Sequence, residues 1–149
     1  MPSIRPVLAA VALLLLALVA PALAAPLEPL DIETKAGVRH FQVEVMRSDA
    51  DRERGLMYRR DLGPDRGMLF QFDKDDRIFM WMKNTYLPLD MVFFGKDGRV
   101  VSIARDTEPL SERIISSGEP ATAGAATSWT SSALTSRSIA AARPRRAAG

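Results

Sequence analysis

The residues with the clearest capacity for chemistry lie inside one apolar stretch, Met80–Phe94, which reads MWMKNTYLPLDMVFF. Four polar residues interrupt its large apolar side chains: Lys83, Asn84, Thr85 and Asp90. A buried strand excludes an unpaired charge, so these groups predict either a bend in the chain or a polar site. Pro88 cannot donate a ladder hydrogen bond and disfavours helix before it. We therefore expect a strand, a bend around residues 83–88 and a second strand.

Asp90 is harder to assign to the bend, because it lies between Leu89 and Met91 in a strong strand pattern. One interpretation is structural: backbone amides or a salt bridge to Lys83 or Arg59 hold the carboxylate. The other is a small cleft in which a Trp stacks on a ligand and polar side chains bind its anionic or hydroxyl groups. The residues expected to line this cleft are Arg59, Trp81, Lys83, Asn84 and Asp90.

Two other functions stay open as alternatives. In an acid–base enzyme Asp90 would act beside Lys83, and a glycosidase would also need Asp106 or Glu108 close by as a second carboxylate. The serines lack the surroundings of a hydrolase nucleophile. A Cu(I) carrier could use the thioethers of Met80 and Met82, although methionine at alternating strand positions is more typical of a core. We expect no catalytic residue, and the Met pair is only a weak alternative.

The composition narrows the metal and cofactor chemistry. There is no cysteine, so disulfides, thiolate nucleophiles and cysteine-based metal sites are excluded, and one histidine excludes a histidine cluster. That residue, His40, falls on the polar face of its expected strand and is predicted to face solvent. We expect neither a metal nor another cofactor.

The charge distribution argues against nucleic acid as a partner. The whole chain has a formal charge of +2, but residues 25–120 carry a net charge of −3, and the last 29 residues hold four arginines and no acid. The excess of positive charge therefore belongs to the ends of the chain and not to the expected domain. The expected partner is a small ligand or another protein.

The first 24 residues have the pattern of a secretory signal peptide. Arg5 precedes an apolar run at Val7–Val19, Pro21 ends that run, and Ala22-Leu23-Ala24 fits a cleavage site. The run is too short to span a membrane comfortably. We expect cleavage near Ala24 and a periplasmic or secreted protein, with membrane contact only if the segment stays uncleaved.

The pattern between residues 25 and 120 predicts a mainly β (α+β) domain with one short helix, in a compact β-sandwich, jelly-roll-like or barrel-like fold. Alternation and turn residues predict the strands, and Ser48 with Asp51 predicts a helix start. The expected helix is Asp49–Met57, and the expected strands are Leu27–Thr34, Val38–Met46, Gly67–Phe72, Arg77–Met82, Leu89–Phe94 and Arg99–Ala104.

Four segments, in order and at matching spacing, resemble the DUF192 family, "domain of unknown function 192", many of whose members are exported. They are Gly55-Leu56-Met57-Tyr58-Arg59, Gly67-Met68-Leu69-Phe70, Trp81-Met82-Lys83-Asn84-Thr85 and Pro88-Leu89-Asp90-Met91-Val92-Phe93. The likeness runs from about Leu30 to Pro120. It implies a compact β-sandwich or jelly-roll-like domain with short helices, and it implies no reaction.

The sequence departs from the family pattern in two places. Met80 stands where the family commonly has an aromatic residue, and after Pro120 the family's apolar strand, short helix and last strand are not visible. Residues 121–149 are rich in Ala, Ser, Thr and Arg, so we expect a disordered tail there. Our hypothesis is a slip of the reading frame just after Pro120, which would leave an incomplete domain and a truncated, non-functional fragment. The alternative is a natural linker-like tail that replaced the family's ending.

Together these observations predict a small exported β domain at residues 25–120. Its expected role is a non-catalytic binding or accessory module for a small polar ligand or a peptide.

Overall fold

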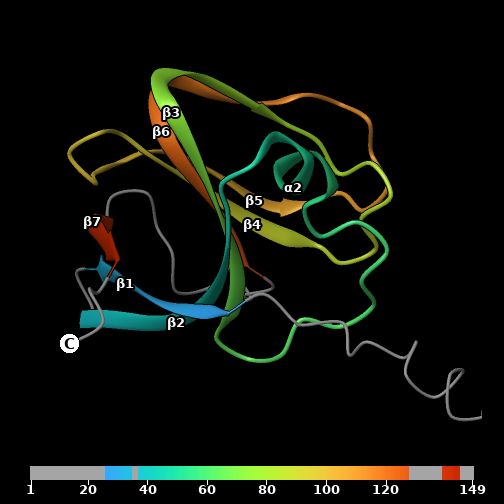
Figure 1. Ribbon diagram of the computed structural model, residues 1–149, viewed down its shortest axis with the longest axis horizontal. Helices are drawn as coiled ribbons and strands as arrows, with labels where there is room; N and C mark the ends of the chain where they lie inside the picture. The colour runs from blue at the N-terminus through green and yellow to red at the C-terminus, as the bar shows by residue number, and fades with distance from the viewer. Residues whose placement is uncertain (1–25, 35–36, 128–138, 145–149) are drawn as a thin grey trace, which may run out of the picture.

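The computed structural model describes residues 26–34, 37–127 and 139–144. Seven strands form one curled sheet in the order β5-β4-β6-β3-β2-β1-β7, with a single helix among the described residues (Figure 1). The elements are β1 (Leu27–Thr34), β2 (Gly37–Met46), α2 (Asp49–Arg54), β3 (Arg66–Met80), β4 (Leu89–Phe94), β5 (Val100–Thr107), β6 (Ile115–Thr127) and β7 (Ile139–Pro144). The predicted mainly β fold with one short helix is confirmed.

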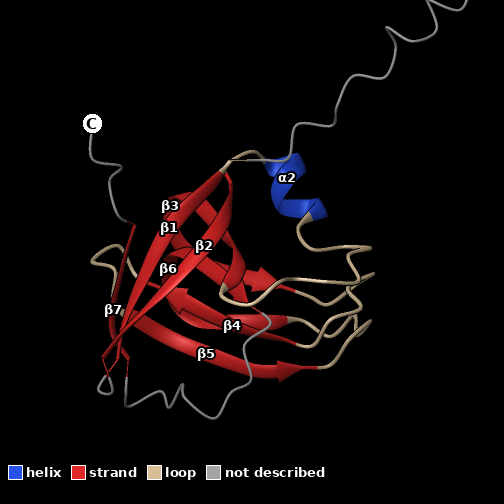
Figure 2. Cartoon of the chain, turned by 90° about the horizontal axis from the view of Figure 1, so that it is seen from below, coloured by secondary structure: helices blue, strands red, loops and turns tan. Residues whose placement is uncertain are grey.

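Most neighbouring strands are antiparallel, and the exception explains the place of the helix. β2 and β3 pair in parallel, so the chain must cross over between them, and α2 lies in that crossover. Figure 2 shows the helix at one side of the strands. The hairpins β1–β2 and β4–β5 pair as the alternation in the sequence predicts.

The helix begins where the sequence predicts and ends earlier. The Ser48 side chain accepts a hydrogen bond of 3.1 Å from the backbone N–H of Asp51, which satisfies one free donor of the first turn. The helix ends at Arg54 instead of Met57, because Gly55 follows with a φ of 45°. Glycine adopts this left-handed conformation without a Cβ clash, and it turns the chain away from the helix axis.

The predicted strands Gly67–Phe72 and Arg77–Met82 are one continuous strand. β3 runs for 15 residues, from Arg66 to Met80, through the charged segment 73–76 that separates the two expected strands. Its pairing with β6 shifts register between Gln71 and Asp76, so the strand bends there without ending. The segment is exposed at the bend, and water therefore solvates its charges.

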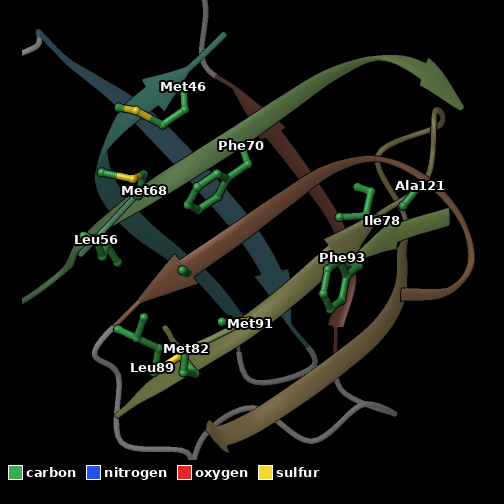
Figure 3. Close-up of a cluster of buried hydrophobic side chains, with 11 residues drawn as sticks. Met46, Leu56, Met68, Phe70, Ile78, Met82, Leu89, Met91, Phe93 and Ala121 are labelled. Atoms are coloured by element: carbon green, nitrogen blue, oxygen red, sulfur yellow. The ribbon is translucent and has the colours of Figure 1, made fainter. Parts of the chain in front are cut away.

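The central strands are buried on both faces, which explains the nearly continuous apolar sequence of β4. Alternating side chains enter two hydrophobic cores, one on each face of the sheet. Leu69, Val92 and Phe94 pack with side chains of β1 and β2. The second core, drawn in Figure 3, contains Met46, Leu56, Met68, Phe70, Ile78, Met82, Leu89, Met91, Phe93, Ala121 and Ala126.

The domain does not end at Pro120. β6 continues to Thr127 beside β3 and β4, and Ala121, Ala125 and Ala126 are at most 1 % exposed. The prediction of disorder was therefore wrong for residues 121–127. It rested on low apolar area, whereas a strand with bulky neighbours on both faces has room only for small side chains. The segment 139–144 also forms a strand, β7, next to β1. Residues 128–138 and 145–149 and the expected signal peptide lie outside the described residues.

Candidate functional site

The polar residues of the apolar stretch lie mainly in a bend between β3 and β4, as predicted. Thr85 donates from its backbone N–H to the Met82 carbonyl at 3.0 Å and from its hydroxyl to the Lys83 carbonyl at 3.2 Å. Its side chain is buried, so these bonds satisfy groups that have lost contact with water. Thr85 therefore holds the bend in place.

Asn84 joins this bend to the loop that follows α2. The Tyr58 N–H donates to the Asn84 carbonyl at 2.8 Å, and the Asn84 side-chain amide donates to the Tyr58 hydroxyl at 2.9 Å. Both residues have a left-handed backbone, with φ of 64° and 54°. The Leu110 N–H donates to the Thr85 carbonyl and ties a third loop to the same bend. Asn84 thus positions loops.

Arg59 is held by β2 and not by Asp90. Its guanidinium donates to both carboxylate oxygens of Glu44, at 2.5 and 2.6 Å. The hydrogen bond to Glu44 raises the pKa of Arg59 above its ordinary value, because it stabilises the charged guanidinium. This bidentate pair fastens the loop after α2 to the sheet.

Asp90 is 1 % exposed, and among the described residues its side chain forms one hydrogen bond, to the backbone of β5. Its Oδ1 accepts from the Asp106 N–H at 2.8 Å, whereas its Oδ2 is buried without a hydrogen-bond partner among the described residues. Burial raises the pKa of Asp90, since desolvation penalises the carboxylate more than the Asp106 N–H and the charge of Arg105 favour it. The structural interpretation of Asp90 is therefore confirmed in its first form, a hold by a backbone amide, and Arg59 and Lys83 pair with Glu44 and Glu112 instead of with Asp90.

A cavity of about 330 Å³ lies between α2, β3 and the bend, and its inner wall is part of the core drawn in Figure 3. Its inner wall is apolar and buried, formed by Leu56, Phe70, Leu89, Met91 and Ala126. Thioethers and aromatic rings continue this surface toward solvent, contributed by Met57, Phe72, Phe79, Met80 and Trp81. The cavity is within the size range of small-molecule sites, at its lower end.

Charged groups surround the mouth of this cavity. The Lys83 ammonium lies 5.0 Å from the centroid of the Trp81 ring, which itself is 42 % exposed. Arg52 is fixed by Asp49, by backbone carbonyls and by the face of Phe72. The mouth therefore combines a stacking surface with positive charge.

The structure brings together only two of the five predicted cleft residues. Trp81 and Lys83 line the cavity, while Arg59, Asn84 and Asp90 are not among its lining residues. The contributions of α2 and of Met57, Phe72 and Phe79 to the cavity were not predicted from the sequence. The sequence did contain one sign of an exposed aromatic surface. Phe79 and Trp81 are two residues apart at the end of an expected strand, so their side chains were expected on the same face, and both are exposed.

The two methionines of the Cu(I) alternative have different surroundings. Met80 lines the cavity, whereas Met82 is 1 % exposed in the core, and its Sδ accepts a hydrogen bond from the Thr107 hydroxyl at 3.2 Å. They do not share one open face. Within the described ranges, no group of three or more His, Asp or Glu residues could hold a metal ion. His40 is exposed as predicted, and its Nδ1 lies 2.7 Å from Asp31 Oδ1.

No helix in the described part of the chain is both long enough and apolar enough to span a membrane.

Comparison with known proteins gives a family and a fold. The model of the DUF192 family, described as an uncharacterized ACR, matches residues 31–130. A solved structure from Sinorhizobium meliloti 1021, described as a proposed transcription regulator, is 42 % identical with a TM-score of 0.67, covering 70 % of this chain and 81 % of that one. A protein of unknown function from Novosphingobium aromaticivorans is 33 % identical with a TM-score of 0.68, covering 72 % and 77 %. No curated protein matches the chain.

Proposed function

This chain belongs to the uncharacterized DUF192 family, and from that premise we propose that it is a non-catalytic binding protein whose ligand enters the cavity between α2 and β3. The observation that carries the proposal is the cavity itself, where half-exposed aromatic rings lead to a buried apolar wall. Beside the helix, the core that packs on this face of the sheet is left open, and buried core side chains form the inner wall of the cavity.

The character of the cavity favours an apolar ligand body over the small polar ligand that the sequence suggested. The polar side chains of the bend already have hydrogen-bond partners within the protein: Asn84 donates to the Tyr58 hydroxyl and Thr85 donates to the Lys83 carbonyl. The remaining lining is largely aliphatic, aromatic and thioether. Methionine side chains adapt to different ligand shapes, which suits a binding surface.

Separation of the candidate acid and base supports binding over catalysis. Lys83 lines the cavity, whereas Asp90 is buried in β4 and does not line it. An acid–base reaction would need both groups within hydrogen-bond reach of one substrate. The charge argues against nucleic acid as the partner, since residues 25–120 carry a net charge of −3. Export remains part of the proposal, supported by the signal-like residues 1–24.

Replacing Trp81 with alanine is expected to weaken binding of a neutral apolar probe, N-phenyl-1-naphthylamine, about tenfold, because the stacking face at the mouth is lost. Fluorescence titration of the full-length chain measures this. Tyr86→Ala is the matched control: Tyr86 is 37 % exposed and lies 4.9 Å under the Arg60 guanidinium, much as Trp81 lies under Lys83, but Tyr86 does not line the cavity. Equal effects of the two substitutions, or no binding by the unaltered chain, would contradict the proposal.

A further inference from the structure

We propose that the ligand of this cavity is a small organic acid, with an apolar body inside the cavity and a carboxylate bound at its mouth by Lys83 and Arg54. This inference rests on the proposed function and adds the chemical class of the ligand. It requires that the mouth carry cations whose charge the protein itself does not fully neutralise.

Lys83 meets this requirement. It forms a long ion pair with Glu112, 3.8 Å from Nζ to Oε1, which is beyond hydrogen-bond distance, and it stacks over the ring of Trp81. The Glu112 side chain is 66 % exposed, so water screens this pair and it neutralises the Lys83 charge only in part. An ammonium has three donors, and this arrangement leaves them available to a ligand. The side chain is 40 % exposed and lines the cavity, so a carboxylate at the mouth can replace solvent around it.

Arg54 adds a second available cation. It lies in the last turn of α2, is exposed, lines the cavity and forms no ion pair with any described residue. Arg52 does not contribute in the same way, because its guanidinium is bound to Asp49 at 2.5 Å and to the Gln71 carbonyl at 2.7 Å. Arg52 and Asp49 neutralise each other. The other charged residues of the lining are Lys83, Arg54 and Glu53, so the lining carries one net positive charge.

The volume limits the size of the body. Roughly ten non-hydrogen atoms fit into the cavity if each takes about the 30 Å³ that a water molecule takes in the liquid. A straight-chain acid of eight carbons or a short arylalkanoic acid has this size. The probe N-phenyl-1-naphthylamine is larger, so only its naphthyl group, of about ten carbon atoms, is expected to enter the cavity, while its phenyl ring stays at the mouth beside Trp81. Its tail would contact the wall formed by Leu56, Phe70 and Met91, while its carboxylate stays at the level of Trp81 and Lys83.

Displacement of N-phenyl-1-naphthylamine by three eight-carbon probes tests the inference on the full-length chain. Octanol is neutral and leaves water more readily than octanoate, so stronger binding of octanoate requires a cation at the site. We expect octanoate to bind about fivefold tighter than octanol at low salt, and octylamine to bind most weakly. Because these charges are exposed, 1 M NaCl should remove the octanoate advantage.

Lys83→Gln should abolish most of the difference in affinity between octanoate and octanol, and it should leave the affinity for octanol unchanged. Lys74→Gln is the control, since Lys74 is an exposed cation on β3 that does not line the cavity, and it should change neither. If the chain binds N-phenyl-1-naphthylamine but binds octanol as tightly as octanoate or more tightly, the inference that the ligand is an acid is wrong, and the proposal of an apolar site is still supported. If the neutral probe itself does not bind, the proposed function fails and this inference fails with it.

Discussion

Gly67→Ala is expected to lower the free energy of unfolding by about 1–3 kcal/mol, because the added methyl group has no room between β3 and β6. A Cβ at this position would lie 2.9 Å from the Ala126 carbonyl oxygen and 2.9 Å from Thr127 Cγ2. One of these neighbours is backbone, so the strands must separate to admit the methyl group. Urea unfolding followed by circular dichroism measures the loss.

Gly124→Ala provides the control for this effect. It is a buried glycine on the facing strand, where the nearest atoms to an added Cβ are Met80 Sδ at 3.4 Å and Phe93 Cδ1 at 3.5 Å. These are ordinary contacts, and alanine also reduces the entropy of the unfolded chain, so stability should change little. Equal stability of Gly67→Ala and the unaltered chain would contradict the pairing of Gly67 with Thr127, and with it the continuation of β6 beyond Pro120.

Asp90→Asn is expected to raise the free energy of unfolding at pH 7 by about 1–3 kcal/mol, because it removes an unsatisfied buried charge. Asp90 and Thr127 are direct partners across β4 and β6, and Asp90 Oδ2 and Thr127 Oγ1 both lack a hydrogen-bond partner in the described residues. An asparagine carbonyl can still accept from the Asp106 N–H, and its amide can donate to Thr127. Loss of the attraction to Arg105 offsets part of this gain.

The pH dependence of this difference has a definite sign. Folding raises the pKa of Asp90, so the folded state binds more protons than the unfolded state between the ordinary pKa near 4 and the raised value. The stability contributed by Asp90 therefore falls as pH rises through that interval. The gain in free energy of unfolding from Asp90→Asn should be greatest above the raised pKa of Asp90 and should become smaller as the pH is lowered through that interval. A variant less stable than the unaltered chain at pH 7, or an advantage that grows in acid, would show that Asp90 is stabilised as a carboxylate.

Local sequence determined much of this fold. Six consecutive apolar-rich residues predicted β4, Pro88 and the polar residues before it predicted the bend, and Ser48 predicted the start of α2. Each of these features depends on neighbours in the sequence or on a face buried by alternation. The family resemblance was confirmed, and it supplied the fold class more specifically than alternation alone.

The site depended on contacts between distant segments, which the sequence does not display. Arg59 binds Glu44 from β2, Asp90 binds the backbone of Asp106, and α2 completes a cavity whose other walls lie in β3, β4 and β6. The alanines of β6 were misread for a related reason: their burial comes from bulky residues of neighbouring strands. Composition within one segment cannot report the size of the side chains packed against it.

The most direct test of the binding cavity is a methyl-resolved NMR spectrum of the full-length chain with ¹³C-labelled methionine, recorded during titration with N-phenyl-1-naphthylamine. Met57, Met80 and Met91 line the cavity, while Met46, Met68 and Met82 lie in the same core and do not line it. We expect saturable shifts of the methyl signals of Met57, Met80 and Met91 and much smaller shifts of those of Met46, Met68 and Met82. Unchanged signals, or shifts greatest at Met82, would contradict a ligand site between α2 and β3.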